Sequence, residues 1–142
     1  MKVFEDFGRI NFVDGNNVFV GFCNDGICCE YFGYVFVKVL PEVVNGNKTK
    51  GSVELSELEL KDFNFDVNFS KELEIREEPA NWNRGGGGAI SFRLVNNLNE
   101  EIYLILFNHH NGWYSHGFEM KDNKKLIFDG CLWVIKKLLR NK

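Results

Sequence analysis

The sequence predicts a mainly β fold: a single domain over residues 1–142, built as an antiparallel β-sandwich or open barrel with a short C-terminal helix. Two observations lead to this prediction. The chain holds 14 Phe, 3 Trp and 4 Tyr, and aromatic residues favour strands. About eight or nine short apolar runs are separated by turn sequences, without the strand–helix alternation that is typical of parallel sheets. A chain of 142 residues is long enough to bury a real core.

The first half of the chain predicts a hairpin and two further strands. Arg9–Val13 and Val18–Phe22 are rich in β-forming residues and flank Asp14–Asn17, where Gly and Asn tolerate the positive φ angles of tight turns. Tyr34–Leu40 is a mostly apolar run that a proline ends. Phe63–Phe69 alternates four apolar with three polar residues, which predicts a strand with one buried and one exposed face.

The second half predicts four strands and a helix. The strands are Ala89–Val95, Glu101–Phe107, Trp113–Met120 and Leu126–Phe128. Cys131–Arg140 has its apolar residues spaced as on one side of an amphipathic helix, with the basic residues outside. Turns or breaks between these elements are predicted at 96–99, 121–124 and 129–130.

Charge and hydropathy argue against two classes of partner. The net charge is -3, so general attraction to nucleic-acid backbone or anionic lipid is not indicated. No apolar run approaches the roughly 20 residues that a membrane helix needs. The first residues, Met1–Asp6, carry acids where a secretory signal would be apolar. We therefore expect a cytoplasmic protein whose four cysteines are mostly reduced.

The stretch Asn108–Phe118 contains all three histidines, two large aromatics and two amides. We interpret it as a hairpin-type turn between two strands. Across such a turn His110 and His116 would approach each other, as metal ligands or an acid–base pair, or else as polar turn residues without such a role. His109 would point to the opposite face and be dispensable.

The run from Arg84 to Gly88 is the second candidate. Successive N–H groups of a glycine loop, here with Gly86 and Gly87 at its centre, can form a concavity that binds anions, and Arg84 can add a bidentate contact to phosphate. The ending of a P-loop is absent. The alternative is a flexible connection between two strands.

The adjacent residues Cys28 and Cys29, followed by Glu30, are the third candidate. Cys29 and His116 could act as nucleophile and base, with Glu30 or Asp25 orienting the base. The alternative is a pair of buried, inert cysteines, because a cysteine that forms no disulfide behaves as a small apolar residue. The spacing does not match a zinc ribbon.

Two segments, Asp25–Glu30 and Asn111–Ser115, resemble those of an uncharacterised family of small β-rich domains from bacteriophages and bacteria. The chain departs from that pattern where two residues separate Asp25 from the cysteines and where Trp113 stands in place of Tyr. The resemblance implies a phage or mobile-element protein without established enzymatic activity. Such a protein would bind a host protein or sequester a nucleotide signal of host immunity.

Together these features predict a non-enzymatic, phage-type binding protein that sequesters a small nucleotide-like ligand. Aromatic rings would stack on the base, polar groups would hydrogen-bond it, and the glycine loop would hold phosphate. The expected ligand-binding residues are Cys29, Glu30, Arg84, Gly86, Gly87, His110, Asn111, Trp113, Tyr114 and His116.

Two other functions remain open: a protein-interaction module that inhibits a host enzyme, and a hydrolase that uses the His and Cys clusters. No metal or cofactor is expected. A homo-oligomer is plausible, because a small β domain with 14 Phe can bury one sheet face against a copy of itself.

Overall fold

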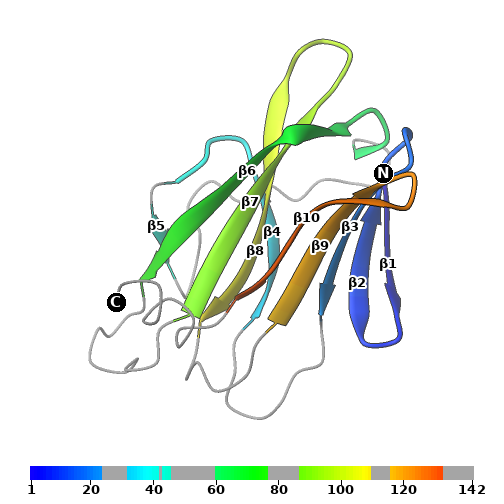
Figure 1. The fold of residues 1–142 in the computed structure, drawn as a ribbon. Helices are drawn as coiled ribbons and strands as arrows, with labels where there is room; N and C mark the ends of the chain where they lie inside the picture. The colour runs from blue at the N-terminus through cyan, green and yellow to red at the C-terminus, as the bar shows by residue number, and fades with distance from the viewer. Residues whose placement is uncertain (24–31, 42, 46–59, 77–86, 110–115, 133–142) are drawn as a thin grey trace.

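The computed structural model describes residues 1–23, 32–41, 43–45, 60–76, 87–109 and 116–132. These residues form ten strands in two five-stranded sheets (Figure 1). The ten elements in these ranges are all strands, and the described residues include no helix long and apolar enough to cross a membrane.

Sheet A is formed by the two ends of the described chain. Its strands are β1 (Lys2–Asp6), β2 (Arg9–Val13), β3 (Val18–Cys23), β9 (His116–Asp122) and β10 (Lys125–Leu132). Their order is β1-β2-β3-β9-β10, and every neighbouring pair is antiparallel. The strands β1 and β10 therefore form the two edges of this sheet.

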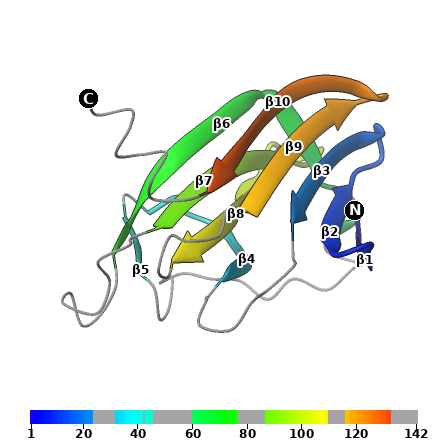
Figure 2. The same ribbon diagram turned by 60° about the horizontal axis from the view of Figure 1, so that its bottom comes forward.

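Sheet B is formed by the middle of the chain. Its strands are β4 (Phe32–Val37), β5 (Val43–Asn45), β6 (Asn64–Arg76), β7 (Gly87–Val95) and β8 (Glu101–His109). Their order is β4-β8-β7-β6-β5, with β5 and β6 parallel and the other pairs antiparallel. Figure 2 shows the two sheets from a second direction.

The main core lies between the sheets. The strands β2, β3, β7, β8 and β9 point alternate side chains inward. Phe12, Val20 and Met120 of sheet A therefore meet Phe92 and Leu104 of sheet B, all of them fully or almost fully buried. The predicted mainly β fold and its antiparallel sandwich are confirmed, and the sheets do not close into a barrel.

A second, smaller cluster lies on the other face of sheet B. Val37, Leu73, Ala89 and Ile105 are buried there, and Tyr103 packs against them. In β7 and β8 these residues alternate with the residues of the main core. Sheet B is therefore apolar on both faces, which explains the nearly continuous hydrophobic run of β8.

The predicted hairpin over Arg9–Phe22 is confirmed, with Asn17 at a φ of 62° in its turn. The other predicted strands also lie on strands of the structure, with two differences: β4 ends at Val37, so the last three residues of the predicted strand Tyr34–Leu40 lie beyond it, and the described part of Trp113–Met120 begins at His116. The short strand β1 was not predicted, because only two of its five residues, Val3 and Phe4, are apolar.

The alternation predicted for Phe63–Phe69 holds only as far as Val67. Phe63, Phe65 and Val67 pack on the main core, but the ladder between β6 and β7 shifts register between Phe65 and Ser70. Such a bulge moves the following side chains to the opposite face. Phe69 consequently packs against Tyr103 with ring centroids 5.8 Å apart, away from the main core.

The predicted break at Asp129–Gly130 is wrong, because both residues lie within β10. The glycine serves packing there: a Cβ at position 130 would stand 2.8 Å from Cζ of Phe118. The predicted C-terminal helix is not supported either. Its first residues, Cys131 and Leu132, are the last residues of β10, and residues 133–142 lie outside the described part.

Candidate functional site

The predicted site maps to one end of the sandwich, at the bottom of Figure 1. Gly87, at the start of β7, pairs with His109 at the end of β8, and β4 begins beside them with Phe32 opposite Asn108. In sheet A, β9 begins at this same end with His116, opposite Leu132. We call this end, defined by the backbones of Gly87, His109 and His116, the strand-end site.

Most of the predicted ligand residues lie outside the described part of the chain. Of the expected set, the structure places only Gly87 and the backbone of His116. The others, together with the proposed partner Asp25, are in ranges 24–31, 77–86 and 110–115: Cys29, Glu30, Arg84, Gly86, His110, Asn111, Trp113 and Tyr114. Their predicted roles stay predictions.

The hairpin interpretation of Asn108–Phe118 is wrong. The strand before it, β8, pairs with β4 and β7 in sheet B, whereas the strand after it, β9, pairs with β3 and β10 in sheet A. The chain therefore crosses between sheets here. Because no hydrogen-bonded ladder joins β8 to β9, these strands form no hairpin tip across which His110 could approach His116.

A pocket of about 390 Å³ lies at the opposite end of the molecule, on the outer face of sheet A. It lies where the β2–β3 and β9–β10 turns come together, and we call it the turn pocket. Its lining residues are Val13, Asn17, Phe19, Lys121, Asn123 and Lys124. Its volume is in the usual range for small-molecule sites.

The floor of the turn pocket is one row of side chains across three strands. Val13 is opposite Phe19, and Phe19 is opposite Lys121. These positions alternate with buried core residues, so their side chains point to the outer face. The strand register thus places an aliphatic group, an aromatic ring and an ammonium group side by side.

Gly21 determines where the aromatic ring lies. A Cβ at this glycine would stand 2.8 Å from Cζ of Phe19 and 2.8 Å from Nη2 of Arg9. Both side chains therefore occupy the space that a larger residue would fill. The missing side chain lets the Phe19 ring lie along the sheet surface beside the pocket.

Charged groups of both signs surround the turn pocket. Glu119 accepts a 3.0 Å hydrogen bond from Nη2 of Arg9, and its carboxylate is 3.7 Å from Nζ of Lys121. One carboxylate thus faces two cations, and the exposed Lys124 on the rim adds a third. Asp122, whose Oδ1 accepts a 3.3 Å hydrogen bond from Nδ2 of Asn123 on the rim, adds a second carboxylate, so three cations face two acidic groups here.

The two turns at the rim are fixed by the backbone. Asn17, Asn123 and Lys124 have φ angles of 62°, 49° and 73°, and the N–H of Asn123 donates to the carbonyl of Asn17 over 3.4 Å. Asparagine tolerates this left-handed conformation, whereas lysine adopts it less readily. These backbone conformations fix the positions of Asn17, Asn123 and Lys124 on the rim.

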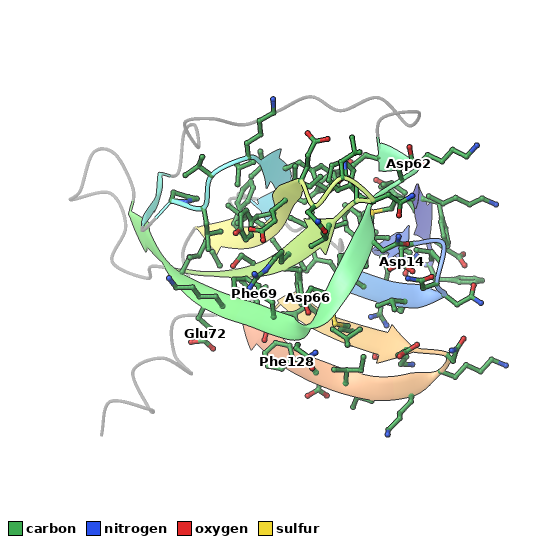
Figure 3. The ribbon with its side chains drawn as sticks, turned by 90° about the horizontal axis from the view of Figure 1, so that it is seen from above. Asp14, Asp62, Asp66, Phe69, Glu72 and Phe128 are labelled. Atoms are coloured by element: carbon green, nitrogen blue, oxygen red, sulfur yellow. The ribbon has the colours of Figure 1, made fainter. Side chains whose placement is uncertain are left out.

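Asp14 anchors the first of these turns. Its Oδ1 accepts hydrogen bonds from the N–H groups of Asn16 and Val18, and its Oδ2 accepts one from the N–H of Phe65 in β6. The side chain is almost completely buried. Figure 3 shows Asp14 near β6, in a view along the sandwich from the turn end.

The turn pocket was not predicted from the sequence. Its two asparagines and Lys124 were recognised only as turn residues, and Phe19 and Lys121 are not neighbours in sequence. A signal was nevertheless present: the turn sequence Asp122-Asn123-Lys124 has lysine where glycine is commonest in a tight hairpin.

A second charged cluster lies on the outer face of sheet B. The guanidinium of Arg93 is 4.2 Å from the ring centroid of Phe69, and it lies 3.6 Å from a carboxylate oxygen of Asp66 and 3.7 Å from one of Glu101. Asp66 and Phe69 come from the same strand, β6 (Figure 3). The ion pairs and the ring contact hold Arg93 on the sheet surface, while its Nε is buried without a hydrogen-bond partner in the described part of the chain.

The hydroxyl of Tyr103 joins this cluster by donating to Glu101 over 3.1 Å. Burial raises the pKa of Tyr103 above its ordinary value of 10.0, and the hydrogen bond and negative charge of Glu101 raise it further, while Arg93 acts in the opposite direction. Over the described ranges, no group of three or more His, Cys, Asp or Glu residues is arranged to hold a metal ion.

The chain matches no model of a protein family, and neither a curated protein nor a solved structure was found to be similar to it.

Proposed function

We propose that this chain is a binding domain, without enzymatic activity, for a small nucleotide-like anion, and that the turn pocket is the site. The observation that carries this proposal is the register that sets the Phe19 ring next to Lys121 on the outer face of sheet A. An aromatic surface beside an ammonium group suits a ligand that is planar at one end and anionic at the other.

The remaining lining residues fit the same ligand. Val13 extends the apolar floor, while Lys121 and Lys124 can contact a phosphate or carboxylate. The amides of Asn17 and Asn123 can donate and accept hydrogen bonds at the edge of a heterocycle. None of the six lining residues is a nucleophile beside a base, so this chemistry supports binding rather than turnover. Binding without turnover is also what sequestration of a signalling nucleotide requires.

The strand-end site is the second candidate position for the same ligand class. It is supported by the pairing of Gly87 with His109 and by the start of β9 at the same end. Gly87 belongs to the glycine-rich segment and His109 to the histidine-rich segment, so both segments reach the same end of the sandwich. Under this alternative, Arg84 and His116 would contact the ligand.

Calorimetry with adenosine monophosphate, adenosine and inorganic phosphate tests the proposal. The monophosphate should bind more tightly than either fragment, because it engages both the ring surface and the lysines. We expect Lys121→Ala and Lys124→Ala each to weaken its binding about tenfold. Lys38→Ala, which removes an exposed lysine elsewhere, is the matched control and should bind as the unaltered chain does.

Amide NMR spectra of the titrated protein locate the ligand independently. Shifts at Asn17, Phe19 and Asn123 would support the turn pocket. Shifts confined to Gly87 and His116, with loss of binding in Arg84→Ala, would instead place the ligand at the strand-end site. If none of the three probes binds, or if binding is unaffected by both lysine substitutions, the turn pocket is not a nucleotide site.

A further inference from the structure

The row of side chains that forms the floor of the turn pocket continues beyond the pocket onto β10. Leu126 is opposite Lys121 in the ladder between β9 and β10. Directly opposite residues of an antiparallel pair share one face of the sheet, so Leu126 points to the same outer face as Lys121. It is not one of the lining residues of the pocket, and it is 49% exposed. An apolar side chain is therefore open to solvent on the far side of Lys121.

A β-bulge in β10 turns Leu126 to the outer face. In a regular strand residues two apart share a face, but Phe128 is opposite Met120 and packs against the main core. The register shift between Leu126 and Phe128 therefore puts these two side chains on opposite faces. Ile127, the additional residue of the bulge, is also partly exposed. The strand β10 thus keeps its aromatic ring in the core and presents aliphatic groups beside the pocket.

The complete row has apolar groups on both sides of one ammonium group. Its order across β2, β3, β9 and β10 is Val13, Phe19, Lys121 and Leu126. Neighbouring strands lie about 4.8 Å apart, so the Cα atoms of Phe19 and Leu126 are separated by roughly 10 Å, with Lys121 between them. A ligand that fits this row carries an anionic group in its middle and a flat or apolar group at each end.

The charges around Lys121 limit how negative the middle group can be. Its Nζ is 3.7 Å from a carboxylate oxygen of Glu119, and that oxygen also accepts a hydrogen bond from Nη2 of Arg9. With Lys124 and Asp122 included, three cations face two carboxylates, which leaves one positive charge in excess. A phosphodiester carries one negative charge, whereas a terminal phosphate carries about 1.5 to 2 at pH 7. The additional charge of a terminal phosphate would lie close to Glu119 and be repelled by it.

We propose that the nucleotide-like ligand of the turn pocket is a dinucleotide, two nucleosides joined by a phosphodiester, an assignment that rests on the proposed function. One base lies on the Phe19 ring, the phosphodiester contacts Lys121, and the second nucleoside lies against Leu126. The row of side chains and the balance of charge independently select this ligand class over a mononucleotide with a terminal phosphate.

Calorimetry of the protein with adenylyl-(3′→5′)-adenosine and with adenosine monophosphate tests this assignment. The dinucleotide should bind about tenfold more tightly, because it alone reaches the apolar surface beyond Lys121. Leu126→Ser should remove this advantage and leave the affinity for the monophosphate unchanged. Leu98→Ser, which changes an exposed leucine in the turn between β7 and β8 of sheet B, is the matched control and should alter neither affinity. The amide signal of Leu126 in NMR spectra should shift with the dinucleotide and not with the monophosphate.

Glu119→Gln tests the role of charge separately. Its amide oxygen can still accept the hydrogen bond from Arg9, but one negative charge beside Lys121 is lost. A ligand with two charges gains twice the electrostatic free energy that a ligand with one charge gains. We therefore expect about threefold tighter binding of the dinucleotide and about tenfold tighter binding of the monophosphate, so that the preference between them narrows. Glu100→Gln, exposed in the β7–β8 turn, should change neither affinity.

Comparison of the two ligands distinguishes a failure of this assignment from a failure of the proposed function. If neither ligand binds, the turn pocket is not a nucleotide site and both proposals are wrong. If the monophosphate binds as tightly as the dinucleotide, or if Leu126→Ser weakens both equally, the proposed function stands and the dinucleotide is overturned. Equal gains for the two ligands in Glu119→Gln would overturn the preference for a phosphodiester as well. Circular dichroism establishes that each variant is folded.

Discussion

Oδ2 of Asp14, in the turn between β2 and β3 of sheet A, accepts a 2.8 Å hydrogen bond from the backbone N–H of Phe65 in sheet B. The other carboxylate oxygen closes the turn itself through Asn16 and Val18. One buried side chain thus shapes a wall of the turn pocket and connects the two sheets. The three groups that donate hydrogen bonds to the Asp14 carboxylate are all backbone N–H groups, so the role of this side chain is structural.

Asp14→Ala should lower the free energy of unfolding by about 3 kcal/mol or more, because buried N–H groups lose a charged acceptor. Asp14→Asn should cost less. Its amide oxygen can still close the turn, but its NH2 group would face the N–H of Phe65. Urea denaturation measures both values, with the exposed Asp129→Asn as the control. An Asp14→Asn variant as stable as the unaltered chain would show that the bond to Phe65 contributes little.

Gly130→Ala should destabilise the sandwich by about 1–3 kcal/mol through overpacking. The added Cβ would stand 2.8 Å from the ring of Phe118, which is buried and packs against Phe128 with centroids 5.6 Å apart. Gly117→Ala is the matched control, since its Cβ would meet nothing closer than 3.8 Å. Thermal unfolding of the two variants should separate them clearly, and equal midpoints would contradict the packing argument.

Gly21→Ala should alter the turn pocket more than it alters stability. The new Cβ would displace the ends of Phe19 and Arg9, which are side chains on the outer face rather than in the core. We expect a loss of about 1 kcal/mol in unfolding free energy together with weaker ligand binding. Gly15→Ala lies in the adjacent turn with its nearest contact at 3.5 Å and serves as the control. Unchanged binding by Gly21→Ala would mean that the position of the Phe19 ring is unimportant.

The raised pKa of Tyr103 predicts a stability change in alkaline solution. Because the folded state holds this proton more tightly than the unfolded state, the contribution is fully present below the ordinary pKa of 10.0 and is lost as the pH rises through the folded pKa. Tyr103→Phe should remove this part of the pH dependence. Denaturation at neutral and alkaline pH measures it, and the tyrosinate absorbance should show one of the four tyrosines ionising late. An identical alkaline loss in the variant would assign the effect to other groups.

Strand positions could be predicted because they depend on local sequence. The alternation in Phe63–Val67 and the turn residues of Asp14–Asn17 act over a few neighbouring residues, and both were interpreted correctly. Asp129–Gly130 shows the limit of this approach. The dipeptide has the composition of a turn, but Gly130 pairs with Phe118 in the ladder between β9 and β10, and the ring of Phe118 occupies the space that a side chain at position 130 would need.

The candidate sites were less predictable than the strands. The histidine-rich segment was singled out correctly as a connection between strands, but the sheets to which those strands belong could not be inferred from its residues. The turn pocket needed Phe19 and Lys121 to be placed on adjacent strands, a pairing between residues about a hundred positions apart.

By itself the sequence determined a mainly β chain, the positions of most strands and the tight turns between them, because side-chain periodicity and backbone preferences are local properties. The tertiary structure decided which strands share a sheet, that β8 and β9 lie in different sheets, and that Phe19 meets Lys121 beside two joined turns. Those outcomes depend on how apolar faces distant in sequence pack together, and no short stretch of residues specifies them.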